Sequence, residues 1–164
     1  MTVLHGSFAV PFELSVPPAQ AFAAFGDPSV RAKWFRLPGR RGVPELDFRV
    51  GGGEVAESTF TPAGAEERLE YRSRFLDIVP DQRIVLAYDF SLNGRRRWAS
   101  LVTVEFAPDA RGCVLTWTEQ YAFLAVTGDG RQDVAHLQGG IRLQLNGLAA
   151  AVEPSSRTTA STRG

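Results

Sequence analysis

Apolar and polar positions alternate near the start of the chain, with apolar side chains at Phe8, Val10, Phe12, Leu14 and Val16. A period of two is typical of a strand with one buried face. The Pro17-Pro18 pair ends this pattern, and apolar residues then recur at helical spacing, interrupted by Gly26-Asp27-Pro28. We therefore expect one strand followed by two short helices, over residues 18–25 and from Pro28 through Phe35.

The middle of the chain, from Leu46 to Phe123, has the pattern of strands separated by turns. Gly, Pro and Asn residues divide it into about six segments of strand length, over residues 47–50, 55–60, 69–79, 83–92, 98–106 and 113–123. Asn93-Gly94 is the sharpest hairpin signal, because a type I′ turn needs positive φ at both central residues. Residues 36–44 contain two prolines and two glycines and predict a loop.

The last segment changes to a period of three to four, with apolar residues at Val134, Leu137, Ile141, Leu145, Leu148 and Val152. This spacing predicts a helix of about five turns with one apolar stripe. Gly139, Gly140 and Gly147 each weaken a helix by about 0.8 to 1 kcal/mol relative to Ala, so we expect another backbone to approach there. Residues 1–152 form one domain in this interpretation, and residues 153–164 a disordered polar tail.

Alternation within the strands also predicts which side chains share a face. The predicted inward faces of the last four strands are rich in aromatic residues, and small Ser73 and Ser100 lie among them. A curved antiparallel sheet of about seven strands would wrap around the long helix, giving an α+β fold. Two interpretations of the interior stay open: a fully packed core, or a core that also encloses a ligand cavity.

Composition and charge remove several classes of function. Eighteen Lys and Arg residues balance eighteen Asp and Glu residues, which argues against nucleic-acid binding. Cys113 is the only cysteine, so a disulfide within the chain and a thiolate zinc site are excluded, and we expect this residue to be buried. The two histidines, His5 and His136, lie too far apart to predict a metal site. With no signal pattern and no apolar run of membrane length, we expect a cytoplasmic protein without membrane insertion.

Several short strings, taken in order, resemble the family named after the activator of Hsp90 ATPase homologue, in the START-like (SRPBCC) superfamily. They are Trp34-Phe35, Asp47-Phe48-Arg49-Val50-Gly51-Gly52, Asp77-Ile78-Val79-Pro80, Tyr88-Asp89-Phe90, Ser100-Leu101-Val102-Thr103-Val104-Glu105-Phe106, Thr118-Glu119-Gln120 and Phe123-Leu124. The resemblance covers residues 7–151. It implies the helix-grip fold, also called START-like or Bet v 1-like, with an apolar cavity between sheet and C-terminal helix that takes lipids, polyketides or other apolar molecules.

Glu119 is the polar residue of greatest interest, because it shares its inward face with Trp117 and Tyr121. A desolvated carboxylate there could anchor a ligand hydroxyl or amine, or act as a general acid. The alternative is a structural carboxylate paired with Arg142, Tyr71 or a helix group. The full set of expected ligand contacts is Trp34, Tyr71, Tyr88, Phe90, Trp98, Phe106, Trp117, Glu119, Tyr121, Leu137 and Ile141.

These residues predict a binding protein for an apolar or aromatic small molecule, with no cofactor. Two alternatives remain open. One is a cofactor-independent cyclase or hydrolase in which Glu119 and His136 form an acid and base couple, although a partly exposed helix histidine is the better explanation of His136. The other, suggested by the family resemblance, is a protein that modulates a chaperone ATPase. The oligomeric state, including a homodimer, cannot be read from the sequence.

Overall fold

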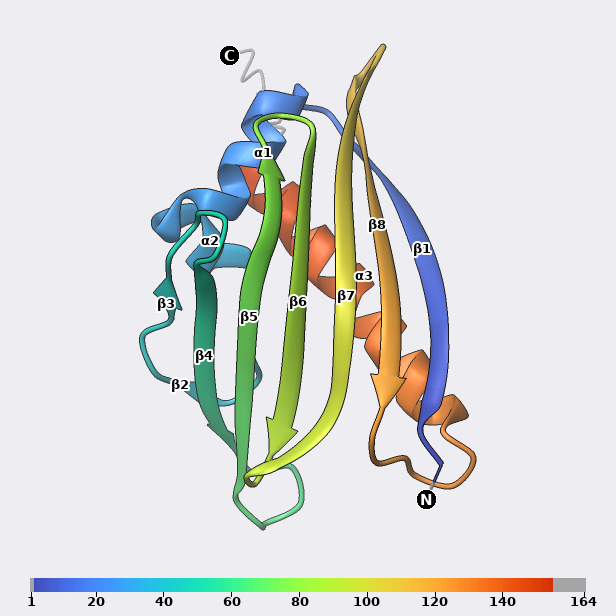
Figure 1. Cartoon of the computed structure of the whole chain (residues 1–164). Helices are drawn as coiled ribbons and strands as arrows, with labels where there is room; N and C mark the ends of the chain where they lie inside the picture. The colour runs from blue at the N-terminus through green and yellow to red at the C-terminus, as the bar shows by residue number, and fades with distance from the viewer. Residues whose placement is uncertain (1, 155–164) are drawn as a thin grey trace, which may run out of the picture.

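The computed structural model describes residues 2–154 and contains eight strands and three helices in that range. In chain order they are β1 (Leu4–Leu14), α1 (Pro18–Gly26), α2 (Pro28–Trp34), β2 (Arg40–Arg41), β3 (Glu45–Leu46), β4 (Gly53–Phe60), β5 (Glu67–Val79), β6 (Arg83–Leu92), β7 (Arg95–Asp109), β8 (Gly112–Phe123) and α3 (Arg131–Val152), as Figure 1 shows. The tail predicted for residues 153–164 lies, from residue 155 on, outside the described residues.

The strands form one antiparallel sheet in the order β1-β8-β7-β6-β5-β4-β2, with β3 pairing β4 beside this path. The first strand pairs with the last, from Leu4 opposite Phe123 to Leu14 opposite Cys113. The sheet curves around α3, which crosses it diagonally (Figure 1). This arrangement confirms the expected α+β helix-grip fold with two short helices after the first strand.

The turn prediction at Asn93-Gly94 is confirmed, since these residues have φ angles of 50° and 76°. The strand predicted over residues 47–50 is wrong, and the only pairing nearby is the two-residue β3. Local hydrogen bonds explain the difference, because Asp47 accepts from the Arg49 backbone N–H and Gly52 donates to the Arg49 carbonyl. The loop predicted over residues 36–44 likewise contains the short strand β2.

The core lies between the concave face of the sheet and one stripe of α3. Leu137, Ile141, Leu145 and Leu148 are the buried residues of that helix, which confirms the predicted stripe. The α3 backbone comes closest to α2, α1 and β1.

The helix glycines do not behave as one group. At Gly147 an added Cβ would lie 3.5 Å from the Cβ of Trp34, so α2 does pack closely there. At Gly139 and Gly140 nothing lies within 4 Å, and both residues are exposed. The close approach predicted at these two positions is therefore wrong. Between residues 2 and 154, none of the helices combines the length and apolar character of a membrane span.

Candidate ligand-binding site

A buried polar cluster on the concave face is centred on Glu119 of β8. The side chain is fully buried, with 0% of its residue surface exposed. The Tyr88 hydroxyl donates to its Oε1 at 2.5 Å, and the Trp117 indole Nε1–H donates to its Oε2 at 3.0 Å. Glu119 is thus held by two neutral donors, and the pairing with Arg142 or Tyr71 considered from the sequence is wrong.

The direction of each hydrogen bond in this cluster follows from donor chemistry. Trp98 Nε1–H donates to the Tyr88 hydroxyl oxygen at 3.0 Å. An indole N–H can only donate, so the Tyr88 proton is left to donate to Glu119. All observed contacts to the carboxyl group therefore suit its ionised form, although no ion pair between Glu119 and a cationic side chain occurs among residues 2–154.

Burial shifts the titration of both acidic groups in the same direction. Burial raises the pKa of Glu119 above its ordinary value of 4.5, while the nearby Ser100 hydroxyl and the hydrogen bonds from Tyr88 and Trp117 lower the pKa and offset part of this rise. Burial and the neighbouring Glu119 charge raise the pKa of Tyr88 well above 10. Tyr88 consequently keeps its proton at neutral pH and remains a donor.

Ser100 of β7 makes the contact between Tyr88 and Glu119 geometrically feasible. Tyr88 lies on β6 and Glu119 on β8, and β7 lies between these strands. Ser100 pairs with Tyr88 on one side and Tyr121 on the other, so its small side chain lets the longer ones meet above it. The buried Ser100 hydroxyl lies close enough to Glu119 and Tyr88 to lower the pKa of both groups, although it makes no hydrogen bond of full geometry among the described residues.

Aromatic rings surround the polar cluster. The Tyr71 and Tyr88 ring centroids lie 5.0 Å apart, Phe90 stacks on Trp98 at 4.4 Å, and Trp98 lies 5.5 Å from Phe123. Phe90, Trp98 and Tyr121 keep part of their surface exposed, whereas the others are buried. On β1, Gly6 leaves room for Tyr121, because an added Cβ would overlap the Tyr121 hydroxyl.

The structure therefore gathers most of the residues expected to contact a ligand in one region. On the sheet they are Tyr71, Tyr88, Phe90, Trp98, Trp117, Glu119 and Tyr121, and Leu137 and Ile141 of α3 belong to the same core. Phe106 instead packs against Phe22 and Phe25 of α1, at 5.8 and 5.6 Å.

Two further candidates lie elsewhere. Trp34 lies among the helices and donates its Nε1–H to the Ala24 carbonyl at 3.0 Å. His136 is exposed on α3, whereas Glu119 is fully buried and bonded to Tyr88 and Trp117. The structure does not bring His136 and Glu119 together as an acid and base couple.

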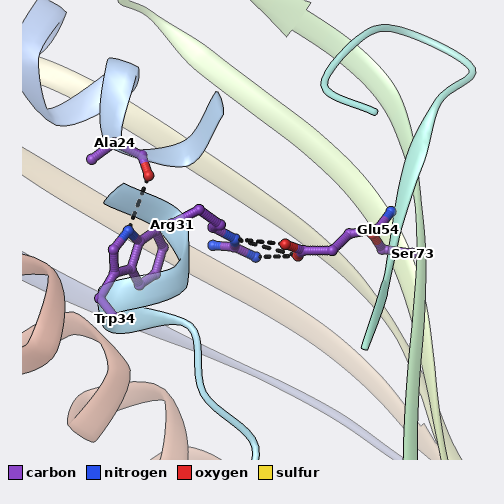
Figure 2. Close-up of polar contacts among 5 residues, drawn as sticks. All are labelled: Ala24, Arg31, Trp34, Glu54 and Ser73. Atoms are coloured by element: carbon purple, nitrogen blue, oxygen red, sulfur yellow. Dashed lines mark hydrogen bonds and ion pairs between the residues drawn. The ribbon is translucent and has the colours of Figure 1, made fainter. Parts of the chain in front are cut away.

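A second buried polar group, which the sequence interpretation missed, connects α2 to the sheet (Figure 2). Arg31 of α2 meets Glu54 of β4 with two nitrogens, Nε at 3.1 Å from Oε2 and Nη2 at 2.7 Å from Oε1. The guanidinium lies over the rings of Phe35 and Trp34, at 4.1 and 4.4 Å from their centroids. Glu54 is 1% exposed, so this is a fully desolvated ion pair.

The sequence did contain one signal for this ion pair, namely the position of Glu54 in its strand. Glu54 has the same parity as Ala56 and Ser58, and all three are buried on the inward face of β4. A carboxylate at an inward position requires a partner. Its backbone N–H also donates to Ser73 Oγ at 3.1 Å, which ties β4 to β5.

Two hollows open on the surface on either side of α2. One, of about 420 Å³, is lined by Phe35, Leu37 and residues 41–44 and 56–57. The other, of about 510 Å³, lies between α2 and α3 and is lined by Trp34, Leu143 and Gly147 among others. Of the expected ligand contacts, Trp34 alone lines either of these hollows.

Two other kinds of chemistry considered from the sequence are a reactive cysteine and a metal site. Cys113 is buried as expected, and burial raises the pKa of its thiol, which disfavours the reactive thiolate. Within residues 2–154, no three His, Cys, Asp or Glu side chains come together in a way that could hold a metal ion.

Comparison with known proteins agrees with this architecture. Residues 15–153 match the family described as activator of Hsp90 ATPase homolog 1-like protein. The crystal structure of Mll3558 from Rhizobium loti is 36% identical with a TM-score of 0.79, and the match covers 92% of this chain and 99% of that one. A Rhizobium leguminosarum protein is 30% identical with a TM-score of 0.80, over 93% and 97% of the two chains.

A more distant structure, DynU16, shares the fold at 18% identity and a TM-score of 0.61, over 90% of this chain and 47% of that one. A search among curated proteins found no match. The family match nevertheless spans most of the sequence, and two solved structures reach 30% identity over almost their whole length. The chain belongs to the activator of Hsp90 ATPase homologue 1-like family, with the helix-grip fold of the START-like superfamily.

Proposed function

We propose that the protein binds a small molecule with an apolar or aromatic body between the middle strands and α3, with the polar group of the ligand at Glu119. The observation that carries this proposal is the full burial of Glu119 with neutral donors and no cationic partner. Burying a charged group without a counterion is costly. A cationic or hydrogen-bonding ligand group at Glu119 would offset that cost.

The surroundings of Glu119 support the same proposal. The aromatic rings offer a large apolar surface, and Phe90, Trp98 and Tyr121 keep part of this surface exposed. The buried Ser100 hydroxyl adds a polar atom beside the carboxylate. Few polar groups within an apolar lining are typical of small-molecule sites.

The fold relatives point to small molecules as well. The START-like superfamily uses this fold to bind apolar ligands, and DynU16 is a protein in the dynemicin biosynthetic locus. The chaperone-modulator alternative rests on the family description, whereas the Glu119 cluster favours ligand binding. The enzyme alternative loses its second group, because His136 is exposed on α3.

The three tryptophans provide a direct test, since each indole N–H gives its own signal in a ¹H–¹⁵N spectrum. Titration with 2-naphthalenemethanol, an aromatic probe with one hydroxyl, is expected to shift the Trp98 and Trp117 signals, because both indoles belong to the Glu119 cluster. The Trp34 signal is the internal control, because its N–H is bonded to Ala24 at α1.

Trp98→Phe and Trp117→Phe variants assign the two signals. The proposal is wrong if the probe, at saturating concentration, leaves both signals in place or moves Trp34 alone. The second pattern would locate binding at the hollow between α2 and α3, which Trp34 lines.

A further inference from the structure

We infer that the natural ligand carries a positively charged nitrogen, an ammonium group on an apolar or aromatic body, which pairs with Glu119. This inference rests on the proposed function and specifies its ligand class. It depends on three features of the site: an uncompensated negative charge, the rings around it, and unused acceptor positions.

The negative charge of Glu119 lacks compensation from the protein. Its two contacts come from neutral groups, Tyr88 and Trp117. The buried cation Arg31 cannot serve Glu119, because both carboxylate oxygens of Glu54 already accept hydrogen bonds from it. Arg142, the cation first considered as a partner, is exposed on α3. A cation supplied by a ligand would therefore meet one unpaired carboxylate in a site shielded from water, where charge interactions are strong.

The rings around Glu119 favour the same sign of charge. Tyr88, Trp98, Trp117 and Phe123 are joined to one another or to Glu119 by hydrogen bonds and ring contacts. Aromatic faces carry negative electrostatic potential, so they attract a cation and repel an anion. A carboxylate-bearing ligand would be opposed by both Glu119 and the rings.

The hydrogen-bonding capacity of the cluster also suits an ammonium group. An ionised carboxylate has about four lone-pair sites, and protein donors use one on each oxygen of Glu119. The buried Ser100 hydroxyl lies beside Glu119 and makes no hydrogen bond of full geometry, so its oxygen offers a further acceptor. An ammonium group has up to three N–H donors, whereas an alcohol has one.

The test compares three probes with the same naphthalene body, namely 2-naphthylmethylammonium, 2-naphthalenemethanol and 2-naphthoate, by calorimetric titration at neutral pH. The wild-type protein is expected to bind the ammonium probe about tenfold or more tightly than the alcohol, and the carboxylate most weakly. In Glu119→Gln, which keeps the shape of the side chain, the ammonium preference is expected to fall to within about twofold.

Glu105→Gln is the matched control, because it removes one negative charge from an exposed position of β7 and is expected to leave the preference unchanged. The wild-type comparison needs no variant, so it stands even if Glu119→Gln folds poorly. Equal or tighter binding of the alcohol or carboxylate overturns the inference while leaving the proposed function intact. An ammonium preference that persists in Glu119→Gln also overturns it. If no probe shifts the Trp98 and Trp117 signals, the proposed function fails together with the inference.

Discussion

Glu54→Gln is expected to lower the free energy of unfolding by about 3 to 5 kcal/mol, the largest single effect that we predict. The substitution leaves the Arg31 guanidinium buried, with 8% of its side chain exposed, and without a carboxylate. The rings of Phe35 and Trp34 lie against the guanidinium and prevent it from turning to water without disrupting the packing of α2. The cost therefore comes mainly from an isolated charge, since Gln preserves the volume of Glu.

Urea denaturation of wild type and variant measures this effect. Asp77→Asn is the control, because its partner Arg83 lies at 2.6 Å but both side chains are more than 40% exposed. We expect the control to cost less than about 1 kcal/mol. Replacing both members of the buried pair, as Arg31→Met with Glu54→Leu, is expected to restore most of the lost stability. Equal costs for Glu54→Gln and Asp77→Asn would contradict this account of the pair.

The wild-type protein is expected to lose stability relative to Glu119→Gln as the pH rises above about 4.5. Burial raises the pKa of Glu119 in the folded state above its ordinary value of 4.5. The folded protein therefore binds a proton more tightly than the unfolded chain. Stability from this residue is complete below the unfolded pKa and is lost as the pH rises through the folded pKa.

The measurement is the difference in unfolding free energy between wild type and Glu119→Gln at several pH values. This difference isolates the titration of Glu119, because the two proteins share all other titrating groups. A difference that grows in favour of wild type with rising pH would mean that the Tyr88 and Trp117 hydrogen bonds lower the pKa more than burial raises it.

The architecture could be predicted because its signals are local. Alternation placed Tyr88, Trp117 and Glu119 on inward faces, and the structure confirms that all three are buried. The hairpin at Asn93-Gly94 followed from backbone sterics alone. The predicted strand over residues 47–50 failed because its apolar alternation is short, and because Arg49 bonds locally to Asp47 through both its backbone N–H and its side chain.

The partners of the buried polar groups could not be predicted, because they depend on contacts between strands and helices far apart in the sequence. Glu119 reaches Tyr88 diagonally across β7, which requires the register that sets Ser100 opposite Tyr88 and Val102 opposite Glu119. The ion pair of Arg31 with Glu54 requires α2 to lie over β4 (Figure 2). Parity identifies such an inward carboxylate, but only the packed structure identifies what satisfies it.

A crystal structure with a brominated probe, 6-bromo-2-naphthalenemethanol, tests the binding proposal most directly, since anomalous scattering locates the bromine independently of any fitted side chain. We expect one bromine peak on the concave side of β6, β7 and β8, facing α3 and near Tyr88, Trp98 and Glu119. A peak found only in the hollows beside α2, or none at a concentration that saturates binding in solution, would contradict the proposal.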